Sequence, residues 1–218
     1  MDHDAITNVI TKNRTIEYGV GILPNPYAAV EPERVRRHKQ AEARKIITDK
    51  IEALTEPRFI TPIETSEAIE ALITLTDSRV ILELGTCTGY GTLHMLRAVI
   101  GKPEARVVSV DARPAHDKEF WRKFYPTLQH VEGWTPSVLN SMPITVFAPY
   151  DLIFVDSDHS IQHCEAELKQ LIGITRPGSV ILFHDCPERQ TPAHAEESKG
   201  VIFQWLHQKV AEGVLRGT

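Results

Sequence analysis

From residue 79 onwards, short apolar runs alternate with stretches in which apolar residues recur at helical spacing. A short apolar run bounded by turn residues predicts a buried strand, whereas helical spacing predicts an amphipathic helix. Regular alternation of the two is typical of an α/β fold with a mostly parallel sheet and helices on both faces. The expected strands are residues 80–84, 106–110, 129–132, 151–155 and 179–183, and the expected helices are 92–100, 115–125, 161–172 and 199–210.

The pattern before residue 57 is different, and it predicts an N-terminal extension (1–56) to a main domain (57–218). Segments 6–11 and 15–20 have strand-like composition, and residues 31–54 form a charged stretch with helical periodicity. A basic cluster at 34–39 lies on this helix. Its composition favours a solvated face, with a contact to a substrate anion or a partner as the alternative.

A second helix is expected over residues 64–75. Thr61, Pro62 and Glu64 have the spacing of a capping box, with Thr61 as the N-cap and proline at the first helical position.

The first expected strand leads into a glycine-rich turn that carries the strongest functional signal. It ends with Glu83, and Gly85, Gly89 and Gly91 follow before a helix begins. This layout holds nucleotide-like ligands in α/β proteins. The spacing G-x-x-x-G-x-G differs from the G-x-G-x-x-G of dinucleotide sites, which disfavours a nicotinamide oxidoreductase. Because a carboxylate suits an ammonium or a hydroxyl, the turn predicts a ligand with an amino-acid end and a nucleoside end.

The run Glu-Leu-Gly-Thr-Cys-Thr-Gly-Tyr-Gly (83–91) resembles the first motif of class I S-adenosylmethionine (SAM) dependent methyltransferases, in the form found in small-molecule O-methyltransferases. The resemblance implies a Rossmann-like methyltransferase sheet with SAM as the cofactor in the main domain. It also implies that the preceding helix lines the cofactor site. The residues implied to bind the cofactor in these two segments are Thr61, Glu64, Glu83, Gly85, Thr86, Gly89 and Tyr90.

Two further positions fit a nucleoside. Asp111, followed by Ala112, ends the second expected strand, where an acid can accept hydrogen bonds from ribose hydroxyls. A turn or helix-capping aspartate is the alternative. Gly133 and Trp134 follow the third strand, where the resemblance implies the adenine site, and Trp134 would either stack on the base or pack in the core.

Ionisable residues gather after the fourth and fifth expected strands. Asp156, Asp158 and His159 follow the fourth, and His184 and Asp185 follow the fifth. Since the carboxyl ends of neighbouring parallel strands face one crevice, these side chains are expected to converge. Carboxylates beside histidines suit a divalent cation. Asp158 could equally cap the helix that begins at residue 161 or contact the metal. An isolated histidine at a strand end, such as His184, more often has a structural role.

Val-Asp-x-Asp-His and the later His-Asp resemble the signature of metal-associated O-methyltransferases, over residues 57–186. The resemblance implies Mg²⁺ or another divalent cation bound by Asp156, Asp185 and His184. His184-Asp185 stands where the catechol type has Asp-Asn, and His159 stands where it has a lysine base. Histidine has a pKa near neutrality, so the expected catalytic residues are His159 as the base and Asp156.

The predicted function is therefore SAM-dependent methylation of a hydroxyl on a small molecule that the sequence does not identify. A metal-independent methyltransferase with a histidine base and a non-catalytic SAM-binding module are the alternatives. The clustered acids and histidines argue against the second alternative, because binding alone does not require them.

Composition limits the partners and the compartment. The net charge of −5 argues against a nucleic-acid-binding face. No apolar run approaches the ~20 residues that cross a membrane, and the polar start does not resemble a signal peptide. Three cysteines, Cys87, Cys164 and Cys186, lack zinc-ligand spacing and suit a reducing compartment. A cytoplasmic protein is expected.

Few residues follow the fifth expected strand, so the sheet is predicted to be shorter than is usual in class I methyltransferases. The fifth strand would then be an edge that proteins generally pair or cover. A hairpin formed by residues 6–20, or the second subunit of a homodimer, is expected to cover it.

Overall fold

The computed structural model describes residues 30–54, 61–113, 115, 117–185 and 199–216. The chain divides into two units, Met1–Lys39 and Gln40–Thr218. Helix α2 (Val30–Ala53) begins in the first unit and ends in the second, which agrees with the helix expected over 31–54. Within the first unit, Glu33 pairs with Arg36 at 2.6 Å and with Arg37 at 2.9 Å, so part of the basic cluster is neutralised by its own helix.

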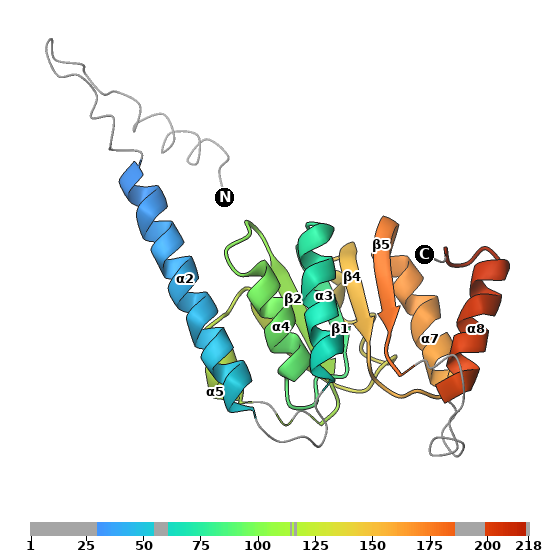
Figure 1. Ribbon diagram of the computed structural model, residues 1–218. Coiled ribbons are helices and arrows are strands. Elements are labelled where there is room, and N and C mark those ends of the chain that lie inside the picture. Colours follow the sequence, from blue (N-terminus) through green and yellow to red (C-terminus); the bar gives the residue numbers. More distant parts are fainter. Residues whose placement is uncertain (1–29, 55–60, 114, 116, 186–198, 217–218) are drawn as a thin grey trace, which may run out of the picture. The chain divides into compact units, whose positions relative to one another are not determined.

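The second unit contains a five-stranded sheet in the order β3-β2-β1-β4-β5, and every pair of neighbours is parallel (Figure 1). This confirms the α/β, Rossmann-like fold expected from the sequence. Four strands begin and end within one residue of the expected positions, whereas β5 begins four residues earlier. The strands are β1 (Val80–Leu84), β2 (Arg106–Asp111), β3 (Leu128–Glu132), β4 (Tyr150–Val155) and β5 (Thr175–Phe183).

The helices between the strands follow the expected order with two differences. Helix α5 is much shorter than expected. It begins later because the Asp117 side chain accepts a hydrogen bond from the Phe120 amide and caps its start, and the chain continues as turns after Arg122. The short helix α6 has no counterpart in the expected elements. The described helices of this unit after α2 are α3 (Ile63–Leu75), α4 (Tyr90–Val99), α5 (Lys118–Arg122), α6 (Met142–Thr145), α7 (Ile161–Leu171) and α8 (Lys199–Ala211), with a 3-10 turn at Ile172–Ile174.

Among the helices that the structure describes, none combines the length and the apolar character needed to cross a membrane.

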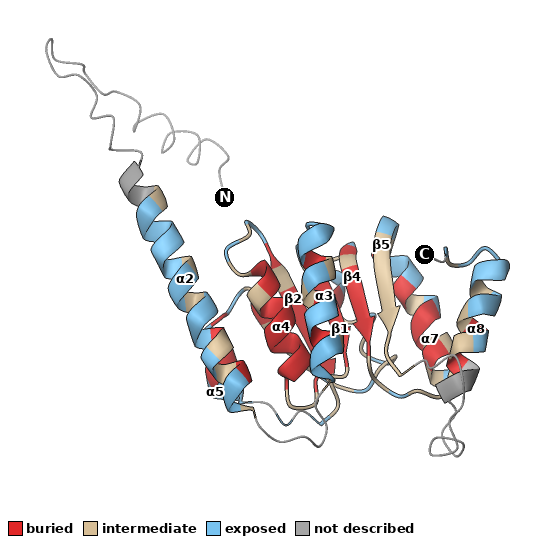
Figure 2. Cartoon of the chain, viewed as in Figure 1, coloured by how far each residue is buried: buried red, intermediate tan, exposed pale blue. Residues whose placement is uncertain are grey.

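Alternating strand residues pack into two cores on opposite faces of the sheet. Ile81 and its neighbours pack with α3, α4 and α5 on one face, whereas Leu82 and its neighbours pack with α6 and the end of α7 on the other. Figure 2 shows the buried residues concentrated on β1, β2, β4 and α4. The central strands of the sheet are therefore covered on both faces.

Strand β5 is one edge of the sheet. Its residues Ile181 and Phe183 pack against a third core cluster, in which α7 contributes Cys164 and α8 contributes Ile202 and Trp205. The expected cover, a hairpin over residues 6–20, lies outside the described residues. Past β5, the described residues form α8 and no further strand, consistent with a short sheet.

The start of α3 differs from the expected capping box. Pro62 occupies the N-cap position, and no side chain caps the helix. The hydroxyl of Thr61 instead points to the carboxylate of Asp156, with 3.5 Å between Oγ1 and Oδ2. The capping prediction was wrong because a partner 95 residues away in sequence attracts the hydroxyl.

The strand ends are tied together by main-chain hydrogen bonds that extend the sheet beyond its last paired residues. These bonds place the ends of β5, β4, β1, β2 and β3 side by side at one edge. The N–H donors and carbonyl acceptors are His184 to Val155 (2.9 Å), Asp156 to Leu84 (2.8 Å), Gly85 to Val110 (2.8 Å) and Gly133 to Asp111 (2.9 Å).

Gly85 is the tightest point of this edge. It has a φ of +97°, and a Cβ atom there would lie 2.0 Å from the carbonyl oxygen of Asp156. Only glycine allows both the left-handed backbone and the contact between the two strand ends.

We expect Gly85→Ala to lower the free energy of unfolding by about 3 kcal/mol or more, since it adds a main-chain clash to backbone strain. Gly178→Ala is the control for strain alone, because Gly178 has a φ of +94° with open space around it, and about 1 kcal/mol is expected. Gly173→Ala has neither problem and should change stability by less than about 1 kcal/mol. Urea unfolding of the three variants measures this order, and an equal loss for Gly85→Ala and Gly178→Ala would contradict it.

Candidate functional site

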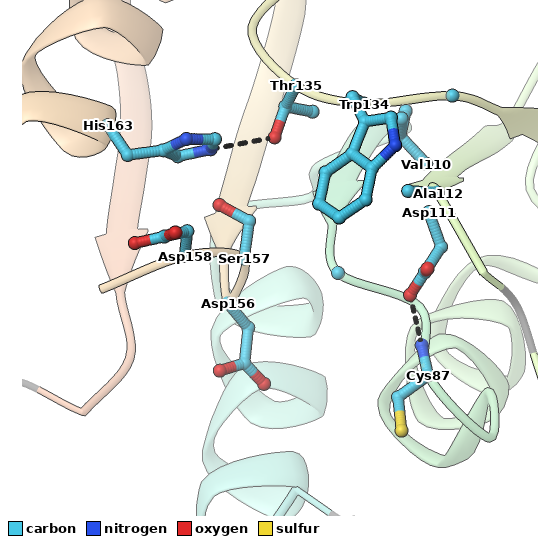
Figure 3. Close-up of a pocket in the computed structure, with 12 residues that line it drawn as sticks. Cys87, Val110, Asp111, Ala112, Trp134, Thr135, Asp156, Ser157, Asp158 and His163 are labelled. Carbon is cyan, nitrogen blue, oxygen red and sulfur yellow. Dashed lines mark hydrogen bonds between the residues drawn. The ribbon is translucent and has the colours of Figure 1, made fainter. Parts of the chain in front are cut away.

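A cavity of about 290 Å³ opens at the carboxyl edge of the sheet. Figure 3 shows Trp134, Asp111 and Cys87 on one side of it and Ser157, Asp158 and His163 on the other. The walls come from the ends of β1, β2 and β4, the segment after β3, and the first turn of α7. The lining residues are Gly85, Cys87, Val110, Asp111, Ala112, Gly133, Trp134, Thr135, Asp156, Ser157, Asp158 and His163.

Asp111 fixes the glycine-rich loop through its carboxylate. Oδ2 accepts a hydrogen bond of 2.7 Å from the Cys87 amide, and Oδ1 accepts one of 2.6 Å from the Arg113 amide. Each carboxylate oxygen can accept more than one hydrogen bond. Asp111 therefore acts as a turn residue, the alternative role from the sequence, and retains lone pairs for a ligand in the cavity.

Trp134 stands at the mouth of the cavity and is not a core residue. Its side chain is 63% exposed, and the guanidinium of Arg113 lies 5.7 Å from the centre of its ring. An exposed aromatic ring above a cavity gives a flat ligand a surface to stack on.

Glu83 lies behind the loop and is only 1% exposed. Its Oε2 accepts a hydrogen bond of 2.5 Å from the hydroxyl of Ser109 and another from the hydroxyl of Thr92. Burial raises the pKa of Glu83 to about 8, although both hydroxyls act to lower it. The side chain does not line the cavity but joins β1, β2 and α4 under the loop.

Thr61, which precedes the N-cap of α3, lies close to the same loop. A Cβ atom at Gly91 would lie 3.1 Å from Oε1 of Glu83 and 3.3 Å from Oγ1 of Thr61. Thr61 also reaches Asp156 at 3.5 Å. Thr61 therefore lies close both to the start of α4 and to the end of β4.

Beside the cavity, one acid and two imidazoles meet. His184 Nδ1 lies 2.9 Å from Asp156 Oδ1, and His159 Nε2 lies 3.4 Å from the same oxygen. Asp185 is 3.7 Å from Nδ1 of His159 and 3.7 Å from Nδ1 of His184. Burial acts to raise the pKa of Asp156, but hydrogen bonds from the two imidazoles outweigh it and lower the pKa below its usual range.

Three of these four side chains lie close enough together to hold a metal ion. Among the described residues, Asp156, His159 and His184 offer ligand atoms that all lie within 4.8 Å of one another. The set expected from the sequence was Asp156, His184 and Asp185, with His159 as a base. The three donors that lie together therefore include His159, whereas the sequence predicted Asp185 as the third ligand.

Asp158 lies in the turn before α7. Its Oδ1 accepts a hydrogen bond of 2.7 Å from the Ser160 amide, and Ser160 is the N-cap of α7. This favours the turn role over the metal role, and Asp158 is not among the three grouped donors.

A second buried acid supports the far wall of the cavity. Glu167 is fully buried, and its Oε1 accepts hydrogen bonds from Ser157 Oγ at 2.7 Å and pairs with His163 Nε2 at 2.9 Å. His163 Nε2 is also 3.0 Å from the hydroxyl of Thr135. The i, i+4 pair of His163 and Glu167 was visible in the sequence, but periodicity alone does not show that it faces a strand end.

The structure brings only part of the expected cofactor set into the cavity wall. Gly85, Asp111, Ala112, Gly133, Trp134 and Asp156 line it. Glu83 and Thr86 are buried beneath the loop, and Glu64 is exposed in the first turn of α3. Residues that the sequence did not single out for the cofactor are Cys87, Val110, Thr135, Ser157, Asp158 and His163.

Residues 82–186 match a protein family described as "Methyltransferase domain". This segment contains the carboxyl ends of all five strands, and helix α3 lies before it.

Two relatives are catechol O-methyltransferases. One, from Mycobacterium tuberculosis (strain ATCC 25618 / H37Rv), is 26% identical over 128 residues, which cover 58% of this chain and 56% of the relative. The other, catechol O-methyltransferase B from Danio rerio, is 28% identical over 132 residues, which cover 55% of this chain and 47% of the relative. The chain spans about half the length of these relatives.

Among solved structures, the O-methyltransferase from Bacillus cereus in complex with SAH has a similar fold. The TM-score is 0.56 at 18% identity, over 78% of this chain and 79% of that one. The similarity supports the Rossmann-like methyltransferase fold.

The raised pKa of Glu83 makes a testable contribution to stability. Because the folded state retains a proton that the unfolded state releases above its ordinary pKa of 4.5, this contribution is present at low pH and is lost as pH rises towards about 8. We expect the wild-type protein to lose stability relative to Glu83→Gln across this window and to level off above it. Urea unfolding at a series of pH values measures the difference. Glu64→Gln is the control for replacing an exposed carboxylate, and a flat line for Glu83→Gln would contradict its raised pKa.

Proposed function

We propose that this chain, which carries a methyltransferase domain over residues 82–186, transfers the methyl group of SAM to a hydroxyl oxygen of a small molecule. The observation that carries the proposal is the position of Asp156. Asp156 lines the cavity, and its carboxylate belongs to the cluster of acid and imidazoles. A methyl donor in the cavity and an acceptor at the cluster would meet at this residue, so the reaction needs little beyond alignment and removal of a proton.

The cavity wall has the groups that a nucleoside needs. In this proposal Asp111 accepts the ribose hydroxyls with its remaining lone pairs, and Trp134 stacks on the adenine. Ala112, Gly133 and the pair of His163 and Thr135 complete this end. When bound, SAM supplies a methyl group that its positively charged sulfur has already activated.

The amino-acid end of SAM is assigned to the loop 85–91 and its neighbours. The carboxylate of Asp156 and the hydroxyl of Thr61 would contact its ammonium group. Gly85, Gly89 and the flanking Thr86 and Tyr90 would shape the loop around it. Glu83 contributes indirectly, because it holds the loop against β2 and α4 through Ser109 and Thr92. A role for Glu64 has no support from its exposed position.

The acceptor hydroxyl is assigned to Asp156, His159, His184 and Asp185. Three donor atoms within 4.8 Å fit a bound divalent cation, as the resemblance to metal-associated enzymes suggested. A divalent cation at this cluster would lower the pKa of the hydroxyl and fix it beside the donor.

A metal-independent reaction is the second candidate, and one distance favours it. His159 Nε2 and Asp156 Oδ1 are 3.4 Å apart, which places the carboxylate beside the imidazole of the candidate base. His159 would then take the hydroxyl proton, and Asp156 would stabilise the resulting positive charge. Both candidates use the same four residues. They differ only in whether a divalent cation lies between these side chains and the acceptor hydroxyl.

The test of function is formation of SAH and of a product in which a methyl group replaces the hydroxyl hydrogen, a net gain of CH2, and mass spectrometry measures both. Because the two relatives are named catechol O-methyltransferases, catechols are the first acceptors to try, followed by other phenols and alcohols. Asp156→Asn is expected to lower turnover by at least about 100-fold. Asp77→Asn, at an exposed acid outside the site, is the matched control.

The same assay with EDTA separates the candidates. Loss of activity that added divalent cation restores supports the cation-assisted reaction, and full activity in EDTA supports the histidine base. Binding of SAM without turnover on any acceptor would point to a binding module, and absence of SAM binding would contradict the proposal.

A separate prediction concerns the nucleoside end. We expect Trp134→Ala to weaken SAM binding about 10-fold, since stacking of a base on an aromatic ring contributes about 1–3 kcal/mol. Trp134→Phe should retain most of the affinity. Tyr125→Ala is the control, because Tyr125 is also exposed but lines a different cavity at the outer strand β3. Isothermal titration calorimetry measures the three affinities, and an unchanged affinity for Trp134→Ala would remove Trp134 from the site.

A further inference from the structure

We infer that Asp156, His159 and His184 form a three-ligand site that prefers a divalent first-row transition ion, of the Mn²⁺, Co²⁺ or Zn²⁺ class, to Mg²⁺. The inference rests on the proposed function, because it specifies the cation for the same cluster. It differs from the sequence expectation in the ligand set and in the class of metal.

The first argument is convergence. His184 Nδ1 and His159 Nε2 approach the same oxygen of Asp156, at 2.9 and 3.4 Å. The three residues come from the end of β4, the loop after it and the end of β5, so the fold brings them together from separate segments. A cation at this point would replace contacts that the three side chains now make with one another.

The second argument is the composition of the set. Mg²⁺ prefers oxygen ligands and is usually bound by carboxylates and water. Two imidazole nitrogens with one carboxylate suit the transition ions, and such a set leaves coordination positions open for a substrate oxygen. An oxygen-rich site of Asp156 and Asp185 would have favoured Mg²⁺, but the grouped donors are two-thirds nitrogen.

The third argument is the position of Asp185. The two ring nitrogens of His159 face different acids, since Nε2 lies 3.4 Å from Asp156 and Nδ1 lies 3.7 Å from Asp185. A ligating histidine commonly has a carboxylate behind its other nitrogen, which orients the ring and raises its basicity. Asp185 fits this supporting role. Its φ of +53° is a left-handed backbone conformation that holds the carboxylate beside both imidazoles.

The experiment is a titration of the untagged full chain with Co²⁺, in the absence of SAM and of any acceptor. The visible absorption of bound Co²⁺ reports its ligands independently of activity. We expect a band that saturates at one equivalent and is removed by Zn²⁺. Mg²⁺ should remove it only at concentrations at least about 100-fold higher than those of Zn²⁺.

Variants then identify the ligands. His159→Asn and His184→Asn should each weaken Co²⁺ binding at least about 10-fold and alter the band. His207→Asn, at an exposed histidine on α8, is the matched control and should change nothing. Asp185→Asn keeps a side chain that tolerates positive φ, and it should weaken Co²⁺ binding while Co²⁺ remains preferred to Mg²⁺.

Three outcomes would overturn the inference: no Co²⁺ band, Mg²⁺ as effective as Zn²⁺ in competition, or unchanged binding in both histidine variants. Calorimetry with SAM on the same samples keeps the two proposals apart, because His159 and His184 are not among the residues that line the cavity. SAM binding without a Co²⁺ band would remove only the metal assignment. A Co²⁺ band without SAM binding would contradict the proposed function and leave the metal site standing.

Discussion

The contact between Gly85 and the carbonyl oxygen of Asp156 is the constraint on which the site depends. Because Gly85 has no Cβ, the loop after β1 can lie directly against the end of β4. This contact sets the distance between the cavity, whose floor is the loop, and the acid and imidazole cluster, which begins at Asp156. A wider separation would leave two sites that do not share a residue.

The electrostatics of this edge follow from where each acid lies relative to water and to its partners. Glu83 is sealed between β1, β2 and α4, and burial raises its pKa to about 8 even though two hydroxyls donate to it. Asp156 is also largely buried, yet the imidazoles of His159 and His184 lower its pKa. Two acids at the ends of adjacent strands thus have opposite protonation tendencies. Glu83, which supports the loop, favours the neutral form, and Asp156, which contacts the two imidazoles, favours the charged form.

Much of the fold could be predicted from the sequence, because its signals are local. The apolar run before Glu83 and the run before Asp156 each fixed a strand to within a residue, and parallel strand ends necessarily share an edge. That geometry is enough to expect Asp111, Asp156 and Asp185 near one another. The length of α5 and the existence of α6 were not predictable in the same way, since each depends on one turn of chain and a local cap.

The parts of the site that escaped prediction depend on contacts between distant segments. Thr61 has the spacing of an N-cap, and only the folded chain shows that its hydroxyl turns to Asp156. The apolar spacing around His163 predicts the helix and its inner face, but only the folded chain shows that His163 contacts the buried Glu167. Likewise, the sequence placed two histidines and two acids together, but which of them face one common point is a matter of side-chain direction.

The strand ends are linked through amide hydrogens and carbonyl oxygens, and those atoms are the same whatever residue is present. The side chains at these ends can therefore be exchanged without separating the strands, provided that Gly85 is kept. Single substitutions at these strand ends can therefore replace an oxygen donor with a nitrogen donor, or a base with a ligand, while the strands stay paired. The departure of His184-Asp185 from the Asp-Asn pair is the kind of exchange that this main-chain linkage tolerates.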